Sequence, residues 1–403
     1  MYSNNSQCDK FFLLITSVLL GFAQTPCQAQ ITLDGTLGPK GSLSGPNFEI
    51  PAEVGRQVGG NLFHSFDQFN IHTDESATFT GPGSIENILG RITGGERSTI
   101  DGWLRSEIPG ANLFLINPAG MLFGPNAQLD VQGSFHATTA DSIQLGEVGR
   151  FDATQPENSV LTAAPPSAFG FLGGNPAGIS IQGSTLAVPT GESLSLIGGE
   201  IQISGGNLSA PDGRIDMVSV SSKGEVISNF QKHQEDINTD SFDQFGTITV
   251  SDRTTINVKG QGGGIFIRSG AFILENNSQI NSSTEEGSNI GSGPNISLAA
   301  DFVELNNSAE INSTTGPQSE NQGGSISIDA EKVFMANNAK VNSRTSSTGS
   351  GNGGNILINS DMLILRGGAI IRSWSFGENN GGMISIKVVD SVLISGEDSG
   401  LLV

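Results

Sequence analysis

The sequence predicts an all-β protein and, within that class, a right-handed parallel β-helix. Apolar residues recur in short pairs with a spacing of two, which is typical of strands with one buried face. The C-terminal part repeats itself about every 30 residues, and no stretch after residue 30 has a sustained helical period of apolar residues. A regular step of this kind disfavours a sandwich of antiparallel strands, the second architecture considered.

The charge and composition of the chain argue against nucleic acid as a partner and against a disordered protein. The chain has 403 residues, and 40 acidic against 19 basic residues give a net charge of −21. Such a surface repels polyanions, and Lys and Arg are scattered along the chain, so nucleic acid is not expected as a partner. Hydrophobic residues make up 36% and charged residues 15%, which is not the composition of a disordered protein.

Residues 1–29 are predicted to be a signal peptide for export. The apolar run over residues 11–23 is too short to span a bilayer comfortably. No other segment is apolar enough to cross a membrane, so we expect no integral membrane segment. Cys8 and Cys27 both lie in the predicted signal, so the exported part has no disulfide.

The C-terminal part consists of equivalent units that begin at Ile265, Ile296, Ile326 and Ile356, with steps of 31, 30 and 30 residues. Each unit contains three alternating pairs, and we expect three short strands that stack on the same strands of neighbouring units. In the first unit the pairs are Ile265/Ile267, Phe272/Leu274 and Ser278/Ile280.

Turn residues and spacings elsewhere support the same fold. The second and third pairs of each unit are separated by a turn residue that tolerates left-handed backbone angles: Asn276, Asn307, Asn337 or Gly367. The period is looser upstream, where one coil of 21 residues separates Leu194 from Ile215.

A fifth unit starts near Ile384 and is cut off at Val403 in an apolar end. An uncapped last coil would expose its core and its strand edges. We therefore expect either a piece of a longer repeat protein or a cap from elsewhere.

The N-terminal part carries a distinctive motif, in which two short apolar segments surround Asn117-Pro118-Ala119-Gly120 and the second ends in Phe123-Gly124. Pro118 fixes its own backbone angle, Gly120 permits a left-handed one, and the Asn117 side chain can bond the turn backbone. We expect a tight turn between two strands. A weaker copy of the motif is Asn175-Pro176-Ala177-Gly178.

These strings resemble the secretion domain of filamentous-haemagglutinin-like exoproteins, also called the haemagglutination-activity domain. The resemblance covers about residues 31–220 and includes NLFHSFDQFNI from residue 61 and APDGRIDMVSV from residue 210. The usual motif has Asn where this chain has Ala119.

The resemblance implies a secretion domain over residues 30–220, which caps and nucleates a β-helix, and a repeat rod over residues 221–403. It implies export from a Gram-negative cell by two-partner secretion, through the periplasm and an outer-membrane β-barrel transporter. The folded chain would be a secreted or cell-surface adhesin or structural rod, with host-cell or surface glycans as possible ligands. Export would depend on the motif residues Asn117, Pro118, Gly120, Phe123 and Gly124, with a secondary motif at Asn175, Pro176 and Gly178.

The alternative function is that of a secreted β-helix polysaccharide lyase or hydrolase, which would need clustered carboxylates. The candidates do not recur at a spacing that places two on one face of neighbouring coils, so we expect no enzyme and no cofactor. A delivery protein whose C-terminal effector is absent here is a third possibility. The candidate carboxylates are Asp67, Asp74, Asp101, Asp130 and Asp141.

The four histidines, His64, His72, His136 and His233, carry no zinc-binding spacing. We expect each of them to be either exposed or satisfied by hydrogen bonds, and we expect no metal site.

Overall fold

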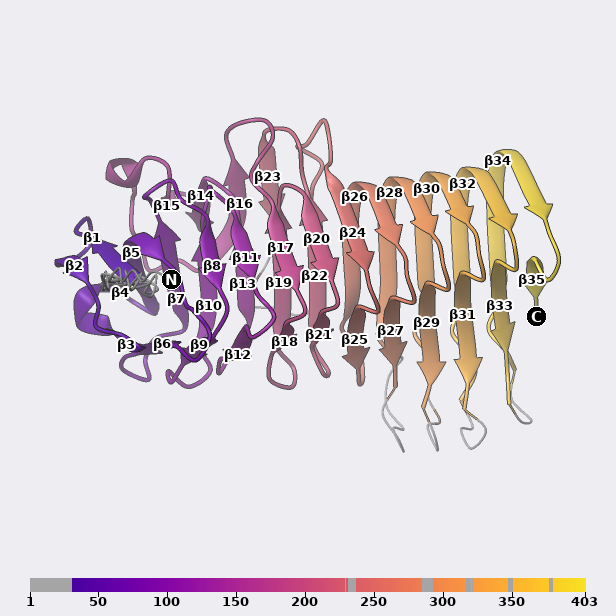
Figure 1. The fold of residues 1–403 in the computed structure, drawn as a ribbon, viewed down its shortest axis with the longest axis horizontal. Coiled ribbons are helices and arrows are strands. Elements are labelled where there is room, and N and C mark those ends of the chain that lie inside the picture. The colour runs from indigo at the N-terminus through magenta and orange to yellow at the C-terminus, as the bar shows by residue number, and fades with distance from the viewer. Residues whose placement is uncertain are drawn as a thin grey trace, which may run out of the picture.

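The computed structural model describes residues 31–228, 230, 237–284, 293–316, 320, 322–346, 351–376 and 380–403, and this part of the chain is almost entirely β-structure. Successive coils stack along the long axis of an elongated molecule (Figure 1). The helices among the described residues are two short 3-10 turns, η1 (Ala52–Val54) and η2 (Pro156–Asn158). Neither of them is long and apolar enough to cross a membrane.

Two long sheets form the walls of a parallel β-helix, which confirms the predicted fold. The smaller wall has 12 strands: β3 (Asn47–Pro51), β6 (Ser76–Thr80), β9 (Trp103–Ser106), β12 (Gln128–Asp130), β18 (Thr185–Ala187), β21 (Asn207–Ser209), β25 (Thr255–Lys259), β27 (Gln279–Ser283), β29 (Glu310–Thr315), β31 (Lys340–Thr345), β33 (Ile370–Trp374) and β35 (Gly400–Leu402).

The larger wall has 19 strands, which also include the antiparallel strands of the N-terminal end. They are β1 (Ile31–Asp34), β2 (Lys40–Ser42), β4 (Arg56–Val58), β5 (Asn61–Phe69), β7 (Asn87–Ile92), β8 (Ser98–Ile100), β10 (Asn112–Ile116), β11 (Met121–Phe123), β13 (Phe135–Thr138), β17 (Ile179–Gln182), β19 (Ser193–Gly198), β20 (Ile201–Ser204), β22 (Arg214–Ser219), β24 (Thr247–Ser251), β26 (Gly264–Leu274), β28 (Asn295–Leu305), β30 (Ile326–Met335), β32 (Ile356–Arg366) and β34 (Ile384–Ser395).

The predicted register of the repeat is confirmed. The first residue of each unit pairs in parallel with the first residue of the next, and the looser upstream coil pairs Leu194 with Ile215. These residues form a continuous apolar column inside the coils, and all of them are at most 1% exposed except Ile384 in the last unit, which is partly buried. Full burial stabilises each such side chain by roughly 1.5–3 kcal/mol. The stacked residues are Ile265, Ile296, Ile326, Ile356 and Ile384.

The expectation of three strands in each unit is wrong, because each unit has two. The first two apolar pairs of a unit lie in one long strand, such as β26, which bends without ending. Inward-facing residues alternate up to Ser269, and the next buried residue is Phe272, three positions on. The slip of one residue makes the corner, so hydrogen bonding continues around it.

The predicted left-handed turns are confirmed. Asn276, Asn307, Asn337 and Gly367 have φ angles of 56°, 50°, 52° and 55°. Asn307 donates a side-chain hydrogen bond to Asn276 Oδ1 (3.1 Å), so the turns are also joined from one coil to the next.

The N-terminal end is closed by antiparallel strands. β1 pairs with β2 and with β5, and β4 pairs with β5, so the first coil is covered by a hairpin. Ile31 and Leu33 of β1 are buried against the core.

A third sheet, which the sequence did not indicate, lies against the outside of the larger wall. Its four antiparallel strands are in the order β15 (Gly149–Asp152), β14 (Ser142–Leu145), β16 (Pro166–Phe171) and β23 (Gly224–Ile227). Phe151 and Phe169 from this outer sheet form a second apolar cluster with Phe63 and Phe114 of the wall.

Candidate functional site

The NPAG motif forms the expected turn between β10 and β11. Asn117 Oδ1 accepts a hydrogen bond from the Ala119 amide (2.9 Å), and the Gly120 amide donates to the Asn117 carbonyl (3.0 Å). Gly120 has a φ of 105°, which a side chain would strain.

Asn117 also ties the turn to the preceding coil. Its Nδ2 donates to the Glu96 carbonyl and to Ser98 Oγ, both at 3.0 Å, and the side chain is fully buried. The amide group therefore has bonds at both its oxygen and its nitrogen inside the folded protein. Its polar atoms are not available to a partner in this state.

The end of the motif is part of the core. Phe123 is fully buried and packs edge-on against Phe135, with ring centroids 6.2 Å apart. The Gly124 amide donates to the Ile100 carbonyl (2.8 Å) of the neighbouring coil.

The second motif lies directly beside the first, in the next coil of this wall, which the sequence did not indicate. Met121 pairs with Ile179, and the Met121 amide donates to the Gly178 carbonyl (3.2 Å). A Cβ on Gly120 would lie 3.1 Å from that same carbonyl oxygen. Asn175 has a φ of 55°, and its amide donates to the Ser221 carbonyl (3.1 Å).

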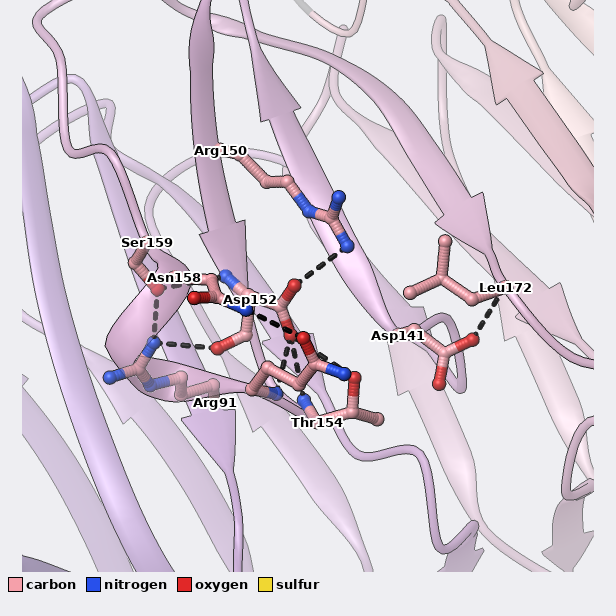
Figure 2. Close-up of polar contacts among 9 residues, drawn as sticks. Arg91, Asp141, Arg150, Asp152, Thr154, Asn158, Ser159 and Leu172 are labelled. Carbon is pink, nitrogen blue, oxygen red and sulfur yellow. Dashed lines mark hydrogen bonds and ion pairs between the residues drawn. The ribbon is translucent and has the colours of Figure 1, made fainter.

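The five candidate carboxylates have separate structural surroundings. Asp74 adopts a φ of 66°, and the Asp67 carbonyl accepts from the Gly94 amide (3.1 Å). Asp130 pairs with Arg105 (2.7 Å), and Asp141 accepts from the Leu172 amide (2.6 Å; Figure 2).

Asp101 is the remaining candidate. Burial acts to raise its pKa, but hydrogen bonds from Thr73 and Asn126 outweigh this effect and lower the pKa below its usual value. Asp101 therefore stays ionised at neutral pH and is not suited to act as a general acid.

The histidines correct one expectation. His64 is fully buried, and neither ring nitrogen has a hydrogen-bond partner, so it is neither exposed nor satisfied. Burial lowers its pKa to about 3. His72 is half-buried, and His233 lies outside the described residues. In the part of the chain that is described, no three His, Cys, Asp or Glu side chains are grouped to hold a metal ion.

His136 lies in a buried polar row that sequence reasoning missed. Its Nδ1 lies 2.9 Å from Ser195 Oγ, which donates to Asp216 Oδ2 at 3.4 Å. The three residues are successive partners on β13, β19 and β22. Burial raises the pKa of Asp216, against the effect of its ion pair with Arg214. Serine stands between the other two, whereas a hydrolase triad places histidine between serine and aspartate.

Arg91 is the second feature that the sequence did not reveal. This side chain is 1% exposed and donates to Ser65 Oγ (2.7 Å), Thr36 Oγ1 (2.9 Å), Ser159 Oγ (2.7 Å) and the Asp152 carbonyl (2.6 Å). Figure 2 shows the last two contacts.

Arg91 thereby joins the N-terminal hairpin, the wall and the outer sheet. Burial lowers its pKa to about 10, while the charges of Asp34, Asp152 and Glu157 act in the opposite direction.

Comparison with known proteins gives the family. A family model described as the TPS secretion domain matches residues 29–267, more than half of the chain. The fold is similar to that of the HMW1 secretion domain from Haemophilus influenzae, with a TM-score of 0.58 and 17% identity over 89% of this chain and 94% of that chain. No curated protein sequence matches this chain. The family match includes both NPAG-type turns, and we conclude that the chain belongs to the two-partner-secretion (TPS) secretion domain family.

Proposed function

We propose that this protein is an adhesive surface rod whose NPAG turn is needed for export before the chain folds. Family membership makes it an exoprotein of two-partner secretion, with an outer-membrane transporter as its partner. The further proposals are passage through the periplasm in an unfolded state, secretion to the cell surface of a Gram-negative cell, and attachment to surface glycans. The proposed role includes no catalytic step.

The burial of Asn117 carries the export proposal. This side chain is 0% exposed and has hydrogen bonds on both its oxygen and its nitrogen, so a partner can bind it only while the turn is unfolded. The same reasoning applies to Phe123, which is buried in the core. This supports recognition of the unfolded motif by the transporter.

Replacing Asn117 with Ala tests this proposal, in cells that carry the cognate transporter. We expect at least a tenfold loss of protein in the medium, roughly the effect of losing one buried polar contact with a partner. Ser98→Ala is the matched control, because it removes a bond of the same turn and leaves Asn117 in place. Undiminished secretion of the Asn117 variant, or equal loss in both variants, would refute a specific export role.

The extent of the secretion domain is also open to test. The resemblance predicts an end near residue 220, and the family match runs to residue 267. We expect a chain ending at residue 267 to be secreted, because it retains β24 and β25, which pair with β20 and β21. Secretion of a chain ending at residue 220 measures whether those later strands are needed.

The elongated shape supports the adhesive role. A β-helix presents one long outer face whose side chains are free to vary without changing the core. Binding of cells by the purified, folded chain tests this role separately from export. A folded chain that binds neither cells nor extracted surface glycans would contradict it.

A further inference from the structure

Two successive coils of the repeat, with strands β31 and β33, differ from the coils before them on the outer face of the smaller wall. At one register position the residues are Asn281, Asn312, Asn342 and then Arg372. Two residues further along each strand, the stacked residues are Ser283, Thr314, Arg344 and Trp374. At this position the change from small polar residues begins one coil earlier, at Arg344. Two arginines and a tryptophan are thus brought together at positions where the two preceding coils carry small polar residues.

Both guanidinium groups are held in place. Arg372 Nε donates to Asn342 Oδ1 (2.8 Å), and the guanidinium lies over the Trp374 ring, 3.8 Å from its centroid. Arg344 Nε donates to Thr314 Oγ1 (3.1 Å). These contacts fix each guanidinium through its Nε. No hydrogen bond from the described residues engages the two terminal nitrogens of either group, which can therefore bind an anion.

The positive charge of the pair is not neutralised. Glu310, the nearby acid, forms an ion pair with Lys340 (2.9 Å), and no described carboxylate pairs with Arg344 or Arg372. Burial lowers the pKa of Arg372, and the neighbouring charge of Arg344 lowers it further, against the effect of Glu310. Two like charges are therefore held close together in a protein whose net charge is −21.

The chain contains its own contrast to this arrangement. Trp103 and Arg105 have the same spacing on the same wall, with the guanidinium 5.7 Å from the ring centroid. There, however, Asp130 accepts from both Nε (2.9 Å) and Nη2 (2.7 Å) of Arg105. The guanidinium of Arg105 is therefore bonded to a carboxylate of the protein itself, whereas that of Arg372 is bonded to the neutral side chain of Asn342.

We propose that Arg344 and Arg372, with Trp374 and Phe376 beside them, bind the carboxylate or sulfate group of an acidic saccharide. This site rests on the adhesive role proposed above and names the chemistry of its ligand. Phe376 is 50% exposed and packs edge-on to Trp374, so an apolar surface for a sugar ring lies next to the charges. The acidic remainder of the protein disfavours a long polyanion and restricts the site to a short segment of the glycan.

The two tryptophans of the chain make the site measurable. In a Trp103→Phe background, Trp374 is the only fluorescent indole. Titrations would use oligogalacturonate as the carboxylate probe, dextran sulfate oligosaccharide as the sulfate probe, neutral dextran oligosaccharide and inorganic sulfate. We expect saturable quenching with at least one acidic saccharide, weakened by added salt.

Variants that restore the residues of neighbouring coils should keep the fold. Arg372→Asn and Arg344→Thr are such variants, and each should weaken binding at least about tenfold. Arg105→Gln is the matched control and should leave binding unchanged. Circular dichroism checks that all variants are folded.

The outcomes separate this site from the adhesive role. A preference for one acidic probe supports the site and identifies its anion. Absence of binding, equal binding of neutral dextran, equal affinity for inorganic sulfate, or equal loss in Arg105→Gln would overturn it. Adhesion of cells by the Arg344→Thr, Arg372→Asn double variant at the wild-type level would leave the adhesive role intact and remove this site.

Discussion

At the scale of single residues, the largest departures from expectation are polar groups that are buried. His64 lies between Phe66 and Phe79, with ring centroids 6.1 and 5.4 Å away, and has no hydrogen-bond partner. Arg91 is buried as well, but each of its three side-chain nitrogens donates at least one hydrogen bond. His64 makes the stability of the fold depend on pH, and Arg91 makes it depend on the contact between the N-terminal hairpin, the wall and the outer sheet.

The folded protein should lose stability in acid through His64. The folded state keeps this ring neutral down to about pH 3, whereas the unfolded chain binds a proton below about pH 6.5. The stabilisation is therefore fully present above pH 6.5 and is lost as the pH falls toward 3, by about 1.4 kcal/mol per pH unit.

Urea unfolding at pH 7.5 and pH 5 measures this effect. We expect the wild type to lose about 2 kcal/mol more than His64→Leu over that interval. The matched control is His72→Leu, at a half-buried ring, which should follow the wild type. If His64→Leu and the wild type respond equally to pH, the buried ring is not the cause.

Replacing Arg91 with Met should destabilise the N-terminal end by about 3–5 kcal/mol, because Ser65 and Asp152, which are buried beside Arg91, would lose its hydrogen bonds and its charge. Amide exchange should rise in residues 31–42 and 149–159, which supply three of its partners. Arg97→Met changes an exposed side chain and should have an effect within about 0.5 kcal/mol. Unchanged exchange in both segments would argue against Arg91 as their link.

At the scale of elements, the turns between strands set the repeat. Asn337 has a φ of 52°, and Gly367 has a φ of 55° at the same position one coil later. This conformation is costly for a residue with a Cβ and no local hydrogen bond, by about 1–2 kcal/mol.

Asn337→Ala should therefore lower the free energy of unfolding by about 1 kcal/mol, and Asn337→Gly should change it by less than half as much. Denaturant midpoints of the two variants provide the measurement. Equal midpoints would mean that the Asn337 hydrogen bond to Asn306 Oδ1 (3.0 Å) matters more than the backbone angle.

The elements that could be predicted from the sequence are those marked by adjacent residues or by a regular repeat. The turn at Asn117 follows from adjacent residues, and the pairing of Ile265 with Ile296 follows from a constant step. The outer sheet could not be found in this way, because β16 pairs with β14 and with β23, and no repeat relates them. The corner within β26 was missed because a bend with continuous hydrogen bonds resembles a break in the alternation.

The site was predicted in part for the same reason. The spacing of the NPAG motif indicated its turn, but the contact between Gly120 and Gly178 depends on which coils are neighbours. Arg344 and Arg372 are 28 residues apart, and only the register brings Arg344 beside Trp374. Burial of Arg91 and His64 depends on the outer sheet and the N-terminal hairpin, whose positions the sequence did not reveal.

At the scale of the whole molecule, the C-terminal part is a stack of units of nearly equal length, so one unit can be removed without changing the pairing of the others. Deleting residues 326–355 removes 30 residues and joins Ser325 to Ile356, which then becomes the partner of Ile296. We expect this variant to fold and to be shorter by about 4.8 Å, the spacing between strands.

Small-angle scattering and circular dichroism test this expectation. Deleting residues 326–340 is the control, because it removes half a unit and places polar residues in the core register. A half-unit deletion as well folded as the full-unit deletion would show that register does not govern the stack.

The pairing of each coil with the coils before and after it also decides how the molecule fails. A protease that cuts one winding removes the support of that winding and leaves distant windings with the neighbours they had. Proteolytic damage therefore stays local, and a cleaved molecule keeps the folded structure of its other coils.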